Sequence, residues 1–210
     1  MKVLLMVCLF SRFLPALLLA APRVIIDDDF DDNSRNPYLW QPLIIGNGYA
    51  SEINGRLETT VQSSTSSTTT LAGFSIRGTI AGDFDVRIDY QLLLPLPLVD
   101  TEPGVVIGLG SLPDPLFVGR YIDNDTLLNQ YIADVGDGEY GISTSDNSGR
   151  LRFTRVGNMM SAYYWNFSAG DWQLIRSATT VVGPISLLAI GVVIDGPGTV
   201  SAALDNFHLE

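Results

Sequence analysis

Apolar and polar positions alternate along much of this chain, and no stretch keeps the 3.6-residue repeat of an amphipathic helix. Residues 83–90 (DFDVRIDY) are the clearest case. In an extended chain, their phenylalanine, valine, isoleucine and tyrosine share one face, and their three aspartates and one arginine share the other. This pattern is typical of a strand in a sheet that has one face in the core and one face in water.

Glycine, asparagine, aspartate and proline interrupt the apolar runs about every ten residues, which is typical of an all-β domain. Gly157-Asn158 is a two-residue hairpin signal between two such runs. About fourteen strands with no helix between them are too many for one flat sheet, so we predict two packed antiparallel sheets. The predicted strands are residues 24–30, 39–45, 56–61, 73–80, 83–94, 104–109, 116–122, 128–135, 140–144, 151–156, 159–165, 172–178, 185–194 and 200–209.

Two stretches do not fit a core strand. Residues 62–70 (QSSTSSTTT) are polar and uncharged, which favours a loop between strands. Residues 94–103 (LPLPLVDTEP) contain three prolines and cannot lie in a central strand, so we expect an exposed loop that packs on a neighbour or borders a cleft. The β pattern continues across both stretches, so residues 22–210 are predicted to form one domain.

The first 21 residues have the pattern of a signal peptide. Lys2 gives a positive start, two apolar runs follow, and Ala20-Ala21 supplies small residues for cleavage. Arg12 within the apolar region and Pro22 after the cleavage site fit this pattern less well, and an uncleaved N-terminal anchor is the alternative. We expect a secreted or cell-surface protein with no membrane insertion after the leader is removed.

The only cysteine, Cys8, lies in this leader. The mature chain then has no disulfide, thiol nucleophile or cysteine-based zinc site, which favours a bacterial source. The formal charge is −11, and removing the first 20 residues, which hold Lys2 and Arg12, leaves 10 basic and 23 acidic residues, or −13. Such a surface disfavours nucleic acid and anionic lipid as partners, whereas it suits calcium, neutral sugars or simple solubility.

Several segments occur in an order and spacing that are specific when taken together. They are the acidic turn 28–32 followed by Trp40, the turn 54–57 (NGRL), the hairpin 149–164 followed by 170–175 (GDWQLI), and the closing strand 203–209 (ALDNFHL). Together they resemble the concanavalin A-like lectin/glucanase superfamily. The resemblance covers nearly all of the mature chain and implies an all-β jelly-roll sandwich. The most similar members are non-catalytic, DUF1349-type or laminin-G-like bacterial proteins.

The catalytic relatives in this superfamily carry an E-x-D-x-x-E motif whose carboxylates cleave the glycosidic bond. This chain lacks the motif, and its positional counterpart, residues 128–135, has Asp134 as its one acid. The sole histidine, His208, lies on the closing strand, and no motif marks a serine partner for it. Nothing in the sequence therefore supports an enzyme, and a degenerate or unrecognised glycoside hydrolase that uses Asp134 with a second carboxylate is the alternative.

The resemblance also implies a structural calcium ion. The positions that match the glucanase site are the carbonyl oxygens of Asp29 and Gly55 and the carboxylate of Asp205. Calcium binds several hard oxygen ligands of this kind. The alternative is that Asp205 caps a sheet edge and that the acidic turn is simply solvated.

A carbohydrate site would use aromatic rings, because sugar C–H faces stack on rings while neighbouring polar groups bind the hydroxyls. The candidate ligand-binding residues are Tyr131, Asp134, Tyr163 and Trp165. Successive residues of a strand point to opposite faces, so Tyr164 cannot share a face with Tyr163 and Trp165. Each ring taken alone is more often a core residue.

The sequence predicts a secreted, non-catalytic module that binds carbohydrate or serves in adhesion, with a glycan as its partner. The alternatives are the hydrolase above and a structural surface or matrix protein that packs against copies of itself.

Overall fold

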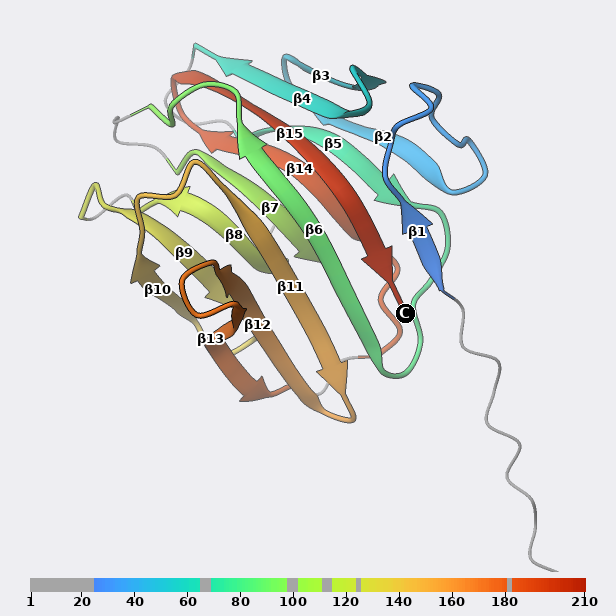
Figure 1. Cartoon of the computed structure of the whole chain (residues 1–210), viewed down its shortest axis with the longest axis vertical. Helices are drawn as coiled ribbons and strands as arrows, with labels where there is room; N and C mark the ends of the chain where they lie inside the picture. The colour runs from blue at the N-terminus through green and yellow to red at the C-terminus, as the bar shows by residue number, and fades with distance from the viewer. Residues whose placement is uncertain (1–24, 65–68, 98–101, 111–114, 124–125, 181–182) are drawn as a thin grey trace, which may run out of the picture.

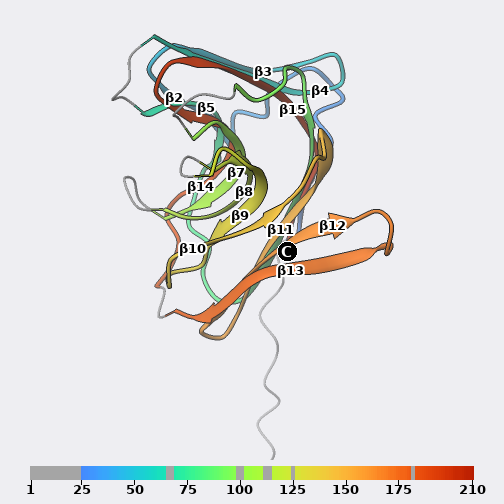
Figure 2. The same cartoon turned by 90° about the vertical axis from the view of Figure 1, so that its left-hand side faces the viewer.

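The structure is a computed structural model that describes residues 25–64, 69–97, 102–110, 115–123, 126–180 and 183–210. These residues form fifteen strands and no helix, arranged as two antiparallel sheets packed face to face (Figures 1 and 2). The predicted all-β sandwich is therefore confirmed. The predicted leader, residues 1–21, falls outside the described residues. Among the described residues, no helix has the length and apolarity needed to cross a membrane.

Sheet A, whose outer face is turned to the viewer in Figure 1, contains eight strands including both ends of the described chain. Its order is β13 (Asp171–Thr179), β12 (Met159–Asn166), β11 (Ser148–Val156), β6 (Phe84–Leu92), β15 (Gly198–Leu209), β4 (Arg56–Ser63) and β3 (Gly48–Ile53), with β1 (Ile26–Asp28) also paired to β15.

Sheet B forms the second layer and contains seven strands. Its order is β10 (Glu139–Ser143), β9 (Asn129–Asp134), β8 (Leu116–Ile122), β7 (Gly104–Leu109), β14 (Leu188–Asp195), β5 (Thr69–Ile76) and β2 (Trp40–Ile45).

The predicted strands agree with the structure to within about three residues at each end, except around β3, in the polar run 62–70 and at residues 77–80, where the predicted strand 73–80 runs past the end of β5 at Ile76. β7 and β8 have the predicted bounds. β3 was missed because its inward positions, Gly48, Ala50 and Glu52, are small or charged and leave no apolar stripe. The interpretation of 62–70 as wholly loop was wrong at both ends, since β4 continues to Ser63 and β5 begins at Thr69; residues 65–68 lie outside the description.

Two hairpins form where the sequence predicts turns. Asn54 and Gly55 join β3 to β4 with φ values of 57° and 69°, as a type I′ turn requires at both central positions. Gly157 joins β11 to β12 with a φ of 59°, in the left-handed region that favours glycine. These turns fix the register of both strand pairs.

The core at the chain ends is built around the fully buried Trp40 of β2. Its ring contacts Phe74 of the same sheet at 6.0 Å and Phe207 of sheet A at 4.9 Å between ring centroids. Its indole Nε1 donates a hydrogen bond to Asp28 Oδ2 at 2.7 Å. Trp40 therefore holds the two sheets and the first strand together.

The first and last strands lie side by side, with Asp28 opposite Phe207 (Figure 1). A bulge between Asp205 and His208 interrupts the pairing of β15 with β6, and Asn206 within it has a φ of 51°. This pairing places the acidic turn after β1 beside the closing strand.

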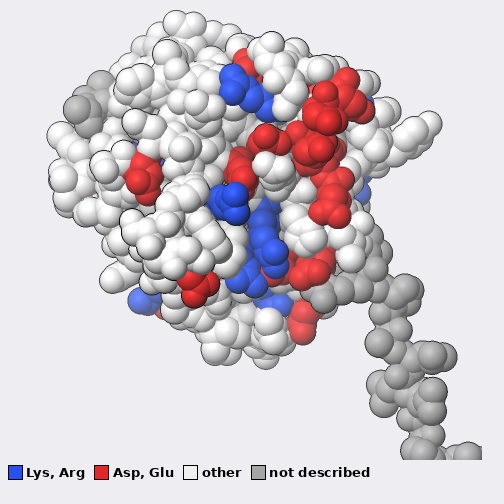
Figure 3. Space-filling view, viewed as in Figure 1, with Lys and Arg blue, Asp and Glu red and all other residues white. Residues whose placement is uncertain are grey.

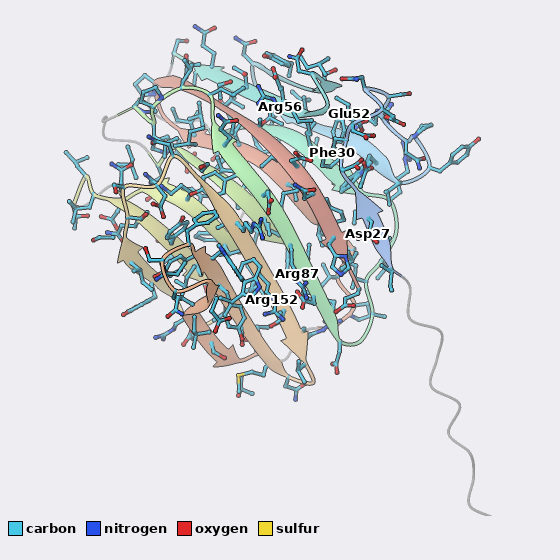
Figure 4. All side chains as sticks on the ribbon, in the orientation of Figure 1. Asp27, Phe30, Glu52, Arg56, Arg87 and Arg152 are labelled. Carbon is cyan, nitrogen blue, oxygen red and sulfur yellow. The ribbon has the colours of Figure 1, made fainter. Side chains whose placement is uncertain are left out.

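A buried carboxylate lies at this end of the sandwich. Glu52 of β3 is only 5% exposed, beside the turn that follows β1 (Figure 4), and its Oε1 has no hydrogen-bond partner among the described residues. Burial, together with the nearby charges of Asp28 and Asp32, raises the pKa of Glu52 to about 7.

Glu52→Gln is expected to stabilise the protein at pH 8 and to change its stability little at pH 4. The unfolded chain ionises Glu52 near pH 4.5 and the folded chain near pH 7, so this residue lowers stability as the pH rises through that window. Removing the charge should add on the order of 2–3 kcal/mol at pH 8, or about 4–10 °C in Tm. Thermal melts at the two pH values measure both effects.

Glu58→Gln is the matched control. A hydrogen bond from Asn54 and the charge of Arg56 outweigh partial burial and hold the pKa of Glu58 below its ordinary value, so its loss should destabilise the protein at pH 8. Equal Tm changes for Glu52→Gln at pH 4 and pH 8 would contradict the account.

Candidate functional site

An open cavity of about 590 Å³, here called the end cavity, lies where β9 of sheet B meets β12 of sheet A. The loops that follow β8, β10 and β12 close around it. Its lining combines hydroxyl, amide and carboxylate groups with aromatic rings, from Leu128, Asn129, Tyr131, Ser143, Thr144, Ser145, Asp146, Tyr164, Asn166, Phe167 and Ser168.

Two stacked tyrosines form the floor of the end cavity. Tyr131 of β9 and Tyr164 of β12 lie 4.4 Å apart between ring centroids and within 15° of parallel, so the stack spans the two sheets. Tyr131 is fully buried, and burial raises its pKa well above the ordinary value, which keeps its hydroxyl protonated.

A hydrogen-bond chain fixes the carboxylate of the end cavity. Tyr90 of β6 donates to the Tyr131 hydroxyl at 3.1 Å, and Tyr131 donates to Asp146 Oδ2 at 2.9 Å. Burial raises the pKa of Tyr90 to about 12, so both hydroxyls carry protons at neutral pH. Asp146 is thereby oriented from below, and its Oδ1 has no protein hydrogen bond among the described residues.

Arg120 supports the same lining from inside the core. Its side chain is 1% exposed, its Nε donates to the carbonyl of Asp146 at 2.9 Å, and one terminal nitrogen donates to Asn129 Oδ1 at 2.7 Å. Burial lowers the pKa of Arg120. Electrostatic interactions with Tyr90 and Tyr131 partly offset this shift. Because Arg120 occupies the Asn129 oxygen, the Asn129 amide nitrogen is left to donate to a ligand.

Exposed apolar side chains surround the mouth of the end cavity. Phe167 and Leu128 are 60% and 50% exposed, and the neighbouring Leu127 holds a φ of 55°. Leu127 N donates to the Asp123 carbonyl, and the Asp123 carboxylate accepts from Thr126, which together hold Leu127 in this sparsely populated conformation. Ring faces at the mouth and fixed polar groups below suit a small polyhydroxylated ligand.

The four predicted ligand-binding residues do not form one site. Tyr131 is buried in the floor of the end cavity, and Tyr163 and Trp165 lie on the outer face of sheet A, opposite Tyr164 as predicted. Asp134 lies at the end of β9, where its carboxylate caps a turn by accepting from Gly136 N at 2.7 Å. The grouping was wrong because Tyr163 and Trp165 point to the outer face of sheet A, away from Tyr131, which lies between the sheets.

A second carboxylate does lie beside Asp134. Glu139 is directly opposite it in the β9–β10 pair, and burial, followed by the charge of Asp134, raises the pKa of Glu139. Glu139 lines a narrow groove of about 200 Å³ with Phe117 and Tyr121 on the outer face of sheet B, but Asp134 does not line that groove. Neither this groove nor the end cavity is lined by both carboxylates.

Sequence reasoning missed Asp146 and Arg120, which matter most for the end cavity. Asp146 lies in a polar loop with no motif around it. Arg120 left a usable signal, since it occupies an inward position of β8 between the buried Val118 and Ile122. A charged residue at the core phase of an apolar strand indicates a buried polar network.

The acidic turn after β1, the β3–β4 turn and the β15 bulge, which carry the three expected calcium positions, are neighbours at one end of the sandwich, here called the acidic end. Asn33 Oδ1 accepts from Gly55 N at 2.9 Å and draws the β3–β4 turn toward the acidic turn. The nearby charge of Asp29 is the largest cause that raises the pKa of Asp31, and Asp205 also contributes. Figure 3 shows these acidic side chains gathered along one margin of the outer face of sheet A.

Of the three residues expected to hold calcium, Asp29 lines a cavity at this end, and Gly55 and Asp205 are not among the residues that line it. This open cavity of about 300 Å³ lies between β1 and the β15 bulge and is also lined by Asn206. Among the described residues, no group of three or more histidine, cysteine, aspartate or glutamate side chains is arranged to hold a metal. The expected ligands are two main-chain carbonyls and one carboxylate, a set that does not require such a group.

Comparisons with known proteins identify the fold. Neither a protein-family model nor a curated protein matches this sequence. Among solved structures, cellulose induced protein Cip1 is similar with a TM-score of 0.59 and 10% identity, covering 88% of this chain and 96% of that one. Lectin I from Ulex europaeus has a TM-score of 0.57 and 12% identity, covering 88% and 97%.

A glycosyl hydrolase family protein from Mycobacterium fortuitum has a TM-score of 0.58 and 11% identity, covering 88% of this chain and 98% of that one. Identities this low establish the fold alone. The chain has the jelly-roll β-sandwich fold shared by concanavalin A-like lectins and glycosyl hydrolases.

Proposed function

We propose that this protein is a non-catalytic carbohydrate-binding module that binds a sugar in the end cavity. The observation that carries the proposal is a 590 Å³ cavity whose hydroxyl, amide and carboxylate groups surround a stacked pair of tyrosines. Cavities of about 300–1,000 Å³ are typical of small-molecule sites. The leader-like first 21 residues support a secreted location.

The polar groups of the end cavity are preorganised for adjacent hydroxyls. Asp146 is held by Tyr131 and by the contact of Arg120 with its carbonyl, so its free oxygen accepts from a sugar hydroxyl. Asn129 supplies a donor beside it, since Arg120 occupies its oxygen. Because this acceptor and this donor are already fixed side by side, binding a pair of hydroxyls requires little further loss of side-chain freedom.

The structural neighbours support this class of ligand. One is a lectin from Ulex europaeus solved with the methyl glycoside of α-L-fucose, and another is the carbohydrate recognition domain of Emp47p, with a TM-score of 0.53. Asp146 is the one charged residue in the cavity lining, which favours neutral sugars over acidic ones.

Calcium at the acidic end is part of this proposal. The carbonyls of Asp29 and Gly55 and the carboxylate of Asp205 would hold the ion. A bound cation would offset the repulsion among Asp29, Asp31 and Asp205 and would join the two chain ends, which fray most easily.

Asp146→Asn is expected to weaken binding of the neutral oligosaccharide that an array selects by about 10- to 100-fold, because it loses a charge-assisted hydrogen bond. Phe167→Ala should weaken it about fivefold through the lost stacking surface. Titration calorimetry measures both. Asp134→Asn, outside the cavity, is the control and should bind as wild type does. Equal affinities for Asp146→Asn and wild type, or no neutral glycan bound at all, would refute the proposal.

Removal of calcium with EGTA is expected to lower Tm by roughly 5–10 °C. A ligand at a hundredfold excess over its Kd stabilises the folded state by about 2.7 kcal/mol, and each kcal/mol is worth about 2–4 °C in a domain of this size. Asp205→Ala should lose most of the sensitivity to EGTA, whereas Asp195→Ala, at the end of β14, should keep it. Identical wild-type melts with and without EGTA would exclude the calcium site.

A further inference from the structure

Three aromatic rings lie on the outer face of sheet A, away from the end cavity. Tyr163 and Trp165 come from β12, and Trp172 comes from β13. The two tryptophans meet edge to face, 5.4 Å apart between ring centroids. Figure 2 shows the β12–β13 hairpin standing out from the body of the sandwich, so these rings form a wall beside the sheet.

Arg152 packs against this wall and is fully engaged by the protein. Its guanidinium lies 5.3 Å from the Tyr163 ring and 5.7 Å from the Trp172 ring. It also donates hydrogen bonds to both oxygens of Asp85, from Nε to Oδ1 at 2.9 Å and from a terminal nitrogen to Oδ2 at 2.7 Å. Although burial raises the pKa of Asp85, Arg87 and Arg152 together hold it below the ordinary value. Arg152 is therefore a structural arginine.

Arg150, two residues earlier on the same face of β11, makes fewer contacts with the protein than Arg152 does. Its guanidinium lies 5.5 Å from the Trp165 ring, and its Nε lies 3.3 Å from Asp89 Oδ1. Its side chain is 45% exposed, and Asp89 is the carboxylate that it contacts. Asp89 also accepts from Asn206 at 3.2 Å, so this carboxylate is shared.

We propose that Arg150 and Trp165 form a second glycan site, which binds a uronic acid unit of an acidic polysaccharide. Trp165 would contact the sugar C–H groups beside the Arg150 guanidinium, which lies over its ring, and the exposed guanidinium would bind the sugar carboxylate through two parallel N–H···O bonds. The site is separate from the end cavity, because Trp165 and Tyr164 point to opposite faces of β12. It does not depend on the function proposed for that cavity.

The other arginines of this face are paired with carboxylates: Arg87 and Arg152 with Asp85, and Arg56 with Glu58. With a side chain that is 45% exposed, Arg150 is the most exposed of these four arginines. Figure 3 shows basic side chains along the middle of the face with acidic ones beside them, and more acidic side chains toward one margin (Arg56, Arg87 and Arg152 are labelled in Figure 4). The chain has a net charge of −11, but more distant acids act weakly because the Debye length is about 8 Å at physiological salt. The binding energy is then set by Arg150 itself.

Hexagalacturonate, with neutral hexagalactose as the matched probe, tests the proposal by titration calorimetry on the intact protein. Wild type should bind hexagalacturonate at least tenfold more tightly than hexagalactose. Arg150→Gln should lose at least tenfold for hexagalacturonate, and Arg150→Lys should lose several-fold, because lysine keeps the charge without the fork. Trp165→Leu should also weaken binding several-fold.

Arg56→Gln is the control, since it removes an equal charge from the same face, where Arg56 pairs with Glu58. Its affinity should stay within twofold of wild type, and the variants' Tm values report that each is folded. Equal losses in Arg150→Gln and Arg56→Gln, or equal binding of the two hexasaccharides, would overturn the proposal. Equally tight binding of hexaglutamate would overturn the sugar assignment and indicate an acidic peptide.

Discussion

The end cavity depends on one hydrogen-bond chain that crosses the sandwich from sheet A to sheet B. Tyr90 belongs to β6, Tyr131 belongs to β9, and Asp146 lies in the loop between β10 and β11. Tyrosine hydroxyls buried between two sheets need partners, and these satisfy one another in series. The chain ends on a carboxylate at the floor of the open cavity, so core packing and ligand geometry are set by the same atoms. Arg120 extends the network to Asn129 and fixes the orientation of its amide.

At the acidic end of the sandwich, aromatic packing rather than a chain of hydrogen bonds joins the two sheets. Trp40 joins the sheets through rings and donates to Asp28, which places the acidic turn against the closing strand. Burial and the charges of Asp28 and Asp32 raise the pKa of Glu52, and the charge of Asp29 is the largest cause that raises the pKa of Asp31, so both carboxylates are shifted toward their neutral forms. A cation at this end would relieve that strain without altering the core. The tyrosine chain and the acidic cluster lie apart, so their contributions to stability should be nearly additive.

Much of the fold was predictable, because alternation and turn residues are local signals. Gly157-Asn158 predicted the β11–β12 hairpin, Asn54-Gly55 predicted a turn although β3 before it was missed, and residues 83–90 predicted the phase of β6. The assignment of strands to sheets was not predictable, since pairing partners are distant in sequence. The sequence therefore did not show that Tyr131 lies between the sheets and Trp165 on the outer face of sheet A. As a result, the predicted ligand-binding site grouped residues that the fold separates. Asp146 acts through a loop conformation that no spacing rule specifies, whereas Arg120 was visible as a charge at a core position.

The most direct test of this account is the affinity of Tyr131→Phe for the neutral glycan that the wild type binds. The substitution keeps the ring and its stack on Tyr164 but removes the hydroxyl that orients Asp146. If the hydrogen-bond chain positions the site, affinity should fall at least about fivefold, with Tm lowered by only a few degrees. Unchanged affinity in a folded Tyr131→Phe protein would show that the chain serves stability alone and would contradict the account.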